Sequence, residues 1–276
     1  MLANTWKELK KAPITAWFGM IVIAVYCFVA IFAGALAPFG ETEVVGFEYE
    51  PWGGEYLLGT DNLGRDMFSR LLYGAQNTVA IAIVTTLLAF FLGGLLGLLA
   101  ASLGGWLDQG LSRLMDVLMA IPQLIFALLL LTIFGTNLVN MVIVIAVLDS
   151  TRVFRLARAV AINIVVMDYV EVARLRGEGL WWQIRHEILP NAMAPLVAEF
   201  GLRFCFVFLF IAALSFLGLG IQPPTADWGS MVRDNATLIT FGDITPLLPA
   251  AAIALLTVGV NFVVDWMLHR SSGLKD

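Results

Sequence analysis

The sequence predicts an all-α polytopic membrane protein with six transmembrane helices, and three observations support this fold class. Of the 276 residues, 60% are hydrophobic and 13% are charged, and the mean hydropathy is +0.88. Several stretches reach the length of about 20 apolar residues that a helix needs to cross a bilayer. Lys and Arg also gather between alternate stretches, as expected for cytoplasmic loops.

The first predicted span covers Ile14 to Ala37, which contains no charged residue. Three lysines precede it in the N-terminal segment 1–13. A secretory signal peptide also has a basic front and an apolar body, and Ala-Leu-Ala at 35–37 resembles a cleavage site. Because the apolar region of a signal peptide is typically about 7 to 15 residues long, we favour an uncleaved first helix.

Five further apolar stretches follow. The predicted spans are about 76–101, 111–134, 138–160, 192–219 and 244–264. Pro122 is predicted to kink the third span, and GTN at 135–137 forms a short turn into the fourth. The predicted transmembrane domain therefore extends over 14–268, and a short tail at 269–276 follows it.

The distribution of Lys and Arg predicts the orientation. Threading six spans from a cytoplasmic N-terminus places twelve of the 16 basic residues on the cytoplasmic side. These twelve are Lys7, Lys10, Lys11, Arg113, Arg152, Arg155, Arg158, Arg174, Arg176, Arg185, Arg270 and Lys275. Arg65, Arg70 and Arg233 fall outside, and Arg203 lies within a span. Both termini and the 161–191 loop are therefore predicted to be cytoplasmic.

The predicted outer loops are acidic instead. Their acids are Glu41, Glu43, Glu48, Glu50, Glu55, Asp61, Asp66, Asp227, Asp234 and Asp243. This excess could attract a cationic ligand or a basic partner surface. Acids also tolerate export and keep a loop soluble, which is the explanation we favour.

The most polar stretch is YVEVARLRGEGLWWQIRHEILPN, residues 169–191. Gly177 and Gly179 are predicted to break it into two short helices. In the second, Trp181, Ile184 and Ile188 share one face. Pro190 and Pro195 then mark the start of the fifth span. Tethered between two spans, the segment suits a rigid knob that fits a groove on a cytoplasmic partner. The alternative is an ordinary interfacial helix anchored by Trp181 and Trp182.

This stretch resembles the EAA loop of permease subunits of ATP-binding cassette importers. The pattern is Glu-Ala-Ala, three residues, Gly, then Leu-Pro twelve and thirteen residues after the Gly. Glu171, Val172, Ala173, Gly177 and Leu189-Pro190 match it, with departures at Val172, where Ala is usual, and at Glu187, where Ile is expected. The resemblance implies that the loop docks into an ATPase subunit and transmits its closure. The residues expected to carry this coupling are Glu171, Ala173, Gly177, Leu189 and Pro190, with Arg174, Arg176 and Arg185 as charge partners.

Two further motifs narrow the resemblance. Residues 58–76 read LGTDNLGRDMFSRLLYGAQ, and residues 215–231 read SFLGLGIQPPTADWGSM. Locally, Asp61 or Asn62 could cap a turn, and Met67 begins a predicted amphipathic helix on the outer surface. Both strings resemble motifs of the permeases that import peptides, opines and nickel. The three motifs together imply the type I ABC importer permease architecture over nearly the whole chain.

The resemblance also implies partners and a location. These are a second, homologous permease, two ATP-binding cassette ATPase subunits, an extracytoplasmic solute-binding protein and the lipid of a bacterial inner membrane. ATP and Mg²⁺ are expected on the ATPases, with no cofactor on this chain, because the sequence has no G-x-x-x-x-G-K-[ST] loop. We expect no catalytic residue, metal site or nucleic-acid surface. Peptide, opine, nickel complex and oligosaccharide stay open as substrates, and an ion-driven secondary carrier or a non-transporting scaffold are the alternative functions.

Charges within the spans form a last group of candidates. Glu199 and Arg203 are spaced i, i+4 on the fifth span and are predicted to pair. They serve either as a substrate-path or gating pair, or as a salt bridge that locks helices. Asp116, Asp149, Asp265 and His269 are predicted to snorkel or cap near helix ends. Gly93 and Gly97 form a G-x-x-x-G step that predicts close helix packing.

Overall fold

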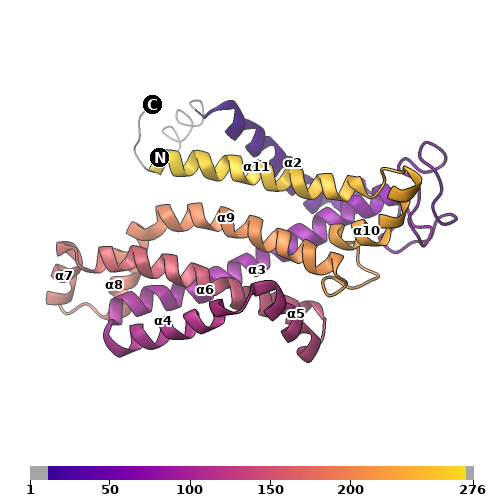
Figure 1. Cartoon of the computed structure of the whole chain (residues 1–276). Helices are drawn as coiled ribbons and strands as arrows, with labels where there is room; N and C mark the ends of the chain where they lie inside the picture. Colours follow the sequence, from indigo (N-terminus) through magenta and orange to yellow (C-terminus); the bar gives the residue numbers. More distant parts are fainter. Residues whose placement is uncertain (1–11, 272–276) are drawn as a thin grey trace. The chain divides into compact units, whose positions relative to one another are not determined.

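The computed structural model describes residues 12–271, and every regular element in this range is a helix (Figure 1). The helices are α2 (Ile14–Leu36), α3 (Met67–Leu103), α4 (Gly105–Ala120), α5 (Gln123–Phe134), α6 (Leu138–Val165), α7 (Asp168–Leu175), α8 (Leu180–Gln183), the π-helix η1 (Ile184–Ile188), α9 (Leu189–Phe216), α10 (Trp228–Asp234), the 3₁₀-helix η2 (Ala236–Phe241) and α11 (Leu247–Ser271). The predicted cytoplasmic charges Lys7, Lys10, Lys11 and Lys275 lie outside the described residues.

Four described helical stretches are long and apolar enough to cross a membrane. They are α2, α3, α11 and the run Leu180–Phe216, which includes α9. The pair α4 and α5 would make a fifth crossing if the two helices count as one broken span. At 28 residues α6 is long enough, but Asp149, Arg152, Arg155 and Arg158 interrupt its apolar sequence. The count of six crossings therefore stays a prediction.

The structure differs from the predicted third span, which was expected to be one kinked helix. Instead α4 and α5 are separate helices bent by 89° at a break of two residues, Ile121 and Pro122. Ile121 has an extended backbone (φ −93°, ψ 133°) because a residue before proline is pushed out of the helical region.

The second predicted span lies within a longer helix. The residues expected to form a separate amphipathic helix from Met67 are continuous with it, as the first turns of α3. Asp61 caps a turn as predicted, because its Oδ1 accepts from the Leu63 and Arg65 backbone N–H groups. Asp66 caps the helix α3 itself, and its Oδ2 accepts hydrogen bonds from the Ser69 backbone N–H at 2.7 Å and from the Ser69 hydroxyl at 2.6 Å.

The helices belong to two compact units, each described by itself. The first comprises residues 1–83, 136–138 and 208–267. In it α2 and α11 approach closely, because a Cβ atom on Gly19 would lie 2.3 Å from the Gly259 carbonyl oxygen. The Tyr26 hydroxyl also donates to the Ala252 carbonyl at 2.9 Å. A small residue at position 19 thus brings the two backbones together.

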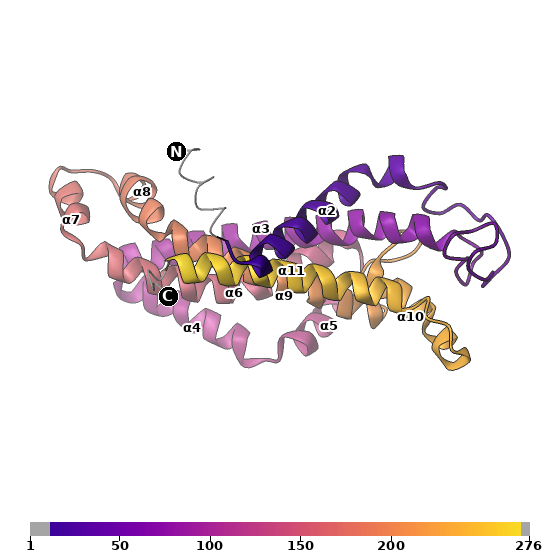
Figure 2. The same cartoon turned by 90° about the horizontal axis from the view of Figure 1, so that it is seen from above.

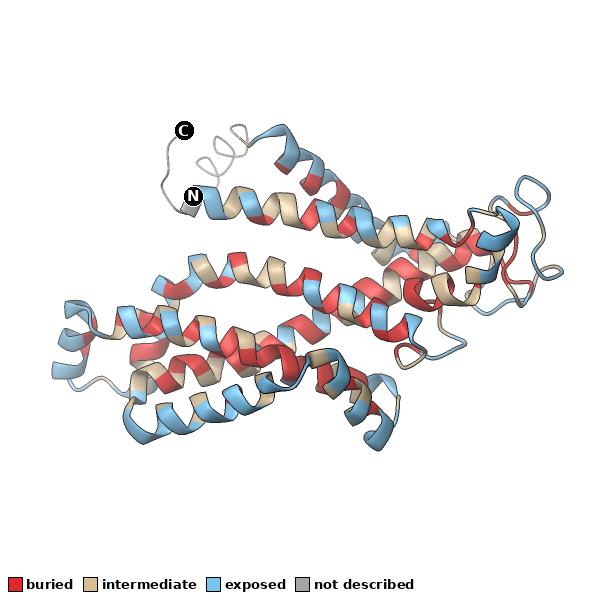
Figure 3. Cartoon of the chain, viewed as in Figure 1, coloured by how far each residue is buried: buried red, intermediate tan, exposed pale blue. Residues whose placement is uncertain are grey.

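The second unit comprises residues 84–135, 139–207 and 268–276, and α6 forms its core. Figure 3 shows α6 largely buried. The predicted G-x-x-x-G step faces it. A Cβ atom on Gly93 would lie 2.3 Å from the Ser150 carbonyl oxygen, and one on Gly97 would lie 2.7 Å from that of Phe154. The close helix packing expected from the sequence is therefore present.

We expect Gly93→Ala to destabilise the protein by about 1–3 kcal/mol, because the added methyl group has no room against α6. Gly94→Ala is the matched control, since a Cβ atom there meets nothing within 4 Å. The thermal unfolding midpoint of each variant in detergent measures the effect. Equal midpoints for the two variants would contradict the packing argument.

Candidate functional site

The 161–191 segment forms the end of α6, then α7, α8 and η1. Figures 1 and 2 both show α7 beyond the ends of α4 and α6. The exposed side chains of α7 include Glu171 and Arg174, and Figure 3 shows this helix largely exposed. The segment is therefore a protruding end of the second unit with charged groups on its surface.

Gly177 forms the turn after α7. Its backbone is left-handed, with φ +83°. The Gly177 N–H donates to the Arg174 carbonyl at 3.0 Å, and the Glu178 N–H donates to the Ala173 carbonyl at 3.1 Å. This is the Schellman arrangement, in which glycine satisfies the last helical carbonyls without steric cost. A Cβ atom on Gly177 would meet nothing within 4 Å. The glycine is thus explained by its conformation and not by any neighbour in this chain.

The predicted coupling residues differ in accessibility. Those exposed to solvent are Glu171, Arg174, Arg176, Arg185 and Pro190, whereas Leu189 is half-buried. Ala173 is fully buried, so its side chain packs within the unit and cannot touch a partner. Arg176 is held over the Trp182 ring at 5.7 Å, and Trp182 in turn stacks on His186.

Apolar side chains anchor the segment to the unit. Val170, Ile184 and Ile188 pack in one cluster with residues of α6 and with Leu98 of α3. The helix face that Trp181, Ile184 and Ile188 were predicted to share is only partly buried. Ile184 and Ile188 are enclosed, but Trp181 is 59% exposed. Gln183 fixes the turn as well, because its Nε2 donates to the Glu178 carbonyl at 2.7 Å. These contacts make the protruding end a rigid part of the second unit.

The helical backbone continues from this segment into α9 without a break. The residues 180–216 form one run, in which Leu189 N–H donates to the Ile184 carbonyl in a π-helical turn. Pro190 was predicted to mark the start of the fifth span and is the second residue of α9, whereas Pro195 lies inside that helix. The π-helix η1 directly precedes Pro190, and such turns accommodate local departures from α-helical bonding. A displacement of α8 would thus be carried directly into α9.

Glu199 and Arg203 of α9 form the predicted ion pair, with Arg203 Nε 2.8 Å from Glu199 Oε1. Arg203 Nη1 also lies 3.6 Å from Asp149 Oδ1, and the guanidinium lies 4.5 Å from the centre of the Phe206 ring. Asp149 was expected near a helix end. It lies instead near the middle of α6 and is 1% exposed. Glu199, Arg203 and Asp149 therefore form a triad that joins α6 to α9, in which Arg203 and Asp149 are buried and Glu199 is partly exposed.

Two other charged residues of α6 also pair across helices. Arg155 Nη2 lies 2.7 Å from Asp116 Oδ1, on the surface, and Arg158 bonds to Asp108. Asp116 therefore makes an ion pair instead of capping a helix. Four charged residues lie between positions 149 and 158. This cluster is the sequence signal that could have predicted ion pairs between α6 and other helices.

In the first unit the 58–76 motif, which includes the start of α3, contacts the 215–231 motif. The Trp228 Nε1 donates to the Leu71 carbonyl at 3.0 Å. The Arg70 guanidinium donates to the Glu41 carbonyl at 3.1 Å and lies 3.2 Å from the Asp61 carboxylate. The motif segments thus hold each other through buried polar groups.

Three of the predicted outer acids, Asp61, Asp66 and Asp227, are buried. Asp227 caps α10 by accepting from the Ser230 N–H at 2.8 Å. Burial raises the pKa of Asp227, and hydrogen bonds from Ser230, Ser215 and Thr78 act in the opposite direction. These three acids stabilise the loop structure and are not available to a ligand or partner surface.

Comparison with known proteins gives consistent findings. Residues 93–272 match the family described as binding-protein-dependent transport system inner membrane component. A dipeptide transport system permease protein of Alkalihalophilus pseudofirmus is 34% identical, over 99% of this chain and 88% of that protein. A di/tripeptide transport system permease protein of Pseudomonas aeruginosa is 37% identical, over 94% and 85%.

A glutathione transport system permease protein of Pectobacterium atrosepticum is 30% identical, over 98% of this chain and 88% of that protein. Among solved structures, a crystal structure of an amino acid ABC transporter with histidines has a TM-score of 0.51 and 22% identity. It covers 74% of this chain and 94% of that one. At this identity the likeness concerns the fold alone.

Proposed function

The chain belongs to the family of binding-protein-dependent transport system inner membrane components, and from this premise we propose that it forms half of the translocation pathway of an ATP-driven peptide importer. Relatives of 30% to 37% identity that span nearly its full length are named for dipeptides, di/tripeptides and glutathione. A short peptide is therefore the substrate class that we assign. The second half of the pathway would come from a homologous permease.

ATP hydrolysis belongs to two partner ATPase subunits in this proposal, together with the Mg²⁺ that ATP requires. Supporting this assignment, the sequence contains no G-x-x-x-x-G-K-[ST] phosphate-binding loop. This chain would thus be a non-catalytic subunit. A solute-binding protein would deliver the peptide from the extracytoplasmic side, and both chain termini would be cytoplasmic.

The single observation that carries the coupling proposal is the continuity of the protruding end with α9. Closure of the ATPases would push on α7, α8 and η1, where Glu171, Arg174 and Arg185 are exposed. The apolar anchoring makes the end rigid, and the unbroken helical run 180–216 would convey the displacement to the Glu199–Arg203 pair. Coupling also requires that the contacts differ between the two states of the ATPases, since equal contacts shift no equilibrium.

We expect the tagged chain, purified in mild detergent from its native membrane, to recover a second permease and ATPase chains at stoichiometric levels. Mass spectrometry of the recovered proteins measures this. The same preparation in liposomes should take up peptide only when ATP and the solute-binding protein are present. Uptake by this chain alone, driven by an ion gradient, would support a secondary carrier. Recovery of the chain alone without any transport would support a scaffold.

A further inference from the structure

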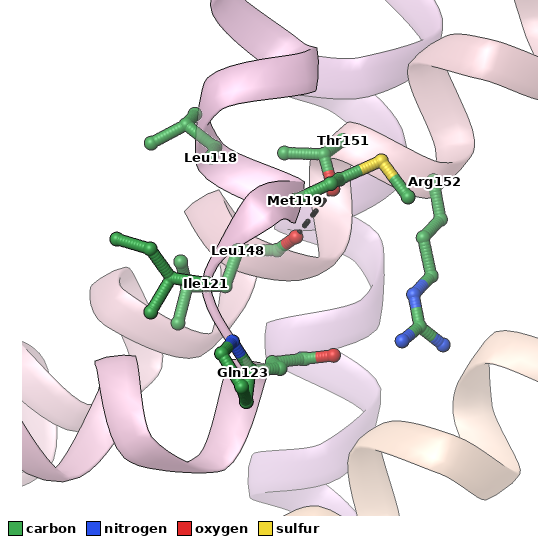
Figure 4. Close-up of a pocket in the computed structure, with 8 residues that line it drawn as sticks. Leu118, Met119, Ile121, Gln123, Leu148, Thr151 and Arg152 are labelled. Carbon is green, nitrogen blue, oxygen red and sulfur yellow. Dashed lines mark hydrogen bonds between the residues drawn. The ribbon is translucent and has the colours of Figure 1, made fainter.

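A cavity of about 170 Å³ lies at the break between α4 and α5 (Figure 4). Ile121 and Pro122 of the break form one wall, and α6 contributes Thr151 and Arg152. Gln123, the first residue of α5, completes the polar lining. The cavity lies entirely within the second unit.

Within the described residues, few hydrogen bonds or ion pairs involve the polar side chains that line this cavity. Figure 4 shows the Gln123 side chain and the Arg152 guanidinium extending toward each other, with no hydrogen bond drawn between them. The Thr151 hydroxyl donates to the Leu148 carbonyl at 2.8 Å. Within residues 12–271, the Arg152 guanidinium lies 6.0 Å from the centre of the Phe206 ring and interacts electrostatically with the Asp149 carboxylate, without forming a salt bridge to it. Its neighbours on the same helix, Arg155 and Arg158, each have a carboxylate partner.

The break falls within the predicted third span, 111–134, so we expect the cavity to hold water. Non-helical backbone at membrane depth is tolerated where it is buried in protein or lines an aqueous cavity. Broken helices of this kind occur at the binding sites of transporters. Arg152 was predicted to be cytoplasmic, but it lies midway along α6 and within the predicted span 138–160. A guanidinium at such a position is costly in lipid, so it too favours an aqueous path. The positive end of the α5 dipole, at Gln123, adds to the positive potential of Arg152.

We propose that this cavity receives the terminal carboxylate of a peptide during translocation. Arg152 would pair with the carboxylate, because a guanidinium fits its two oxygens, and the Gln123 amide would donate a further hydrogen bond. The cavity is too small for a whole peptide, so the contact is with the chain end. This inference rests on the proposed peptide-import function and adds to it a residue that recognises the substrate.

The test uses the purified assembly with its partner subunits and compares trialanine with trialanine amide, which lacks the terminal charge. In wild type we expect saturation-transfer NMR to detect trialanine more strongly than its amide. Arg152→Gln should reduce the trialanine signal, and ATP-driven trialanine uptake, by about tenfold or more. Arg152→Lys should restore part of both, since the positive charge is kept. Arg155→Gln is the matched control, because its surface ion pair lies on the same helix away from the cavity.

The outcomes separate this inference from the proposed function. Equal losses for trialanine and its amide in Arg152→Gln would overturn the carboxylate contact and indicate a structural role for Arg152. Unchanged NMR signals and uptake would overturn it as well. A wild-type assembly that takes up no peptide at all would overturn the proposed function, whereas either of the two preceding outcomes, in an assembly that does take up peptide, overturns the carboxylate contact alone.

Discussion

Gly177→Trp is expected to reduce ATP-driven uptake by about tenfold or more while the protein still folds and inserts. The left-handed backbone at this position costs a non-glycine residue about 1–2 kcal/mol, which a rigid anchored segment can tolerate. Apart from the two adjacent residues, no atom of residues 12–271 lies within 4 Å of a Cβ placed there, so an indole would project outward, where we propose that the ATPase docks. Uptake and ATP hydrolysis measured in the same liposomes should separate, with hydrolysis persisting without transport.

Two controls isolate the cause of this effect. Gly177→Asn adds little bulk and tolerates the left-handed backbone, so most uptake should survive. Gly179→Trp places the same indole two residues away, at a position with ordinary φ of −67° and free space around it. Uptake close to wild type in Gly177→Trp would refute the docking assignment. Equal loss in both Trp variants would show that bulk anywhere on this end is harmful.

The apolar helices could be predicted because lipid requires long uncharged segments, and composition alone reveals them. The geometry of the third segment could not be predicted in the same way. Pro122 predicts only that helical bonding is disturbed. The 89° bend depends on how α4 and α5 each pack, and that is decided by residues distant in the sequence. The charges of α6 could be read from the sequence, but not their partners: Asp149 lies beside a cation of α9, and Arg155 and Arg158 pair with acids of α4.

The coupling segment could be located from its motif spacing, but the direction of its side chains could not. Ala173 and Trp181 both belong to the predicted contact region, yet Ala173 is enclosed and Trp181 is exposed. Burial here depends on contacts with α6, which the local periodicity does not include. The partnership of Asp149 with Arg203 joins two separate spans, and a single sequence contains no signal for that pairing.

Arg203→Leu is expected to destabilise the protein by about 3–5 kcal/mol. Its removal would leave the Asp149 carboxylate, 2% exposed, without the cation that compensates its burial. Glu199 is 19% exposed at its side chain and would suffer less, because it retains some access to water. The thermal unfolding midpoint in detergent measures the loss. A change of less than about 1 kcal/mol would show that solvent, and not Arg203, stabilises Asp149.

The double variant Asp149→Asn with Arg203→Leu distinguishes the two roles that the pair could have. Removing both charges should recover most of the stability, because uncompensated burial and not the absent ion pair is the main cost. Uptake by this variant then decides the function. If uptake returns with stability, the triad only locks α6 to α9. If the protein is stable but uptake stays low, the charges act on the translocation path itself, and the displacement carried by α9 reaches the substrate through them.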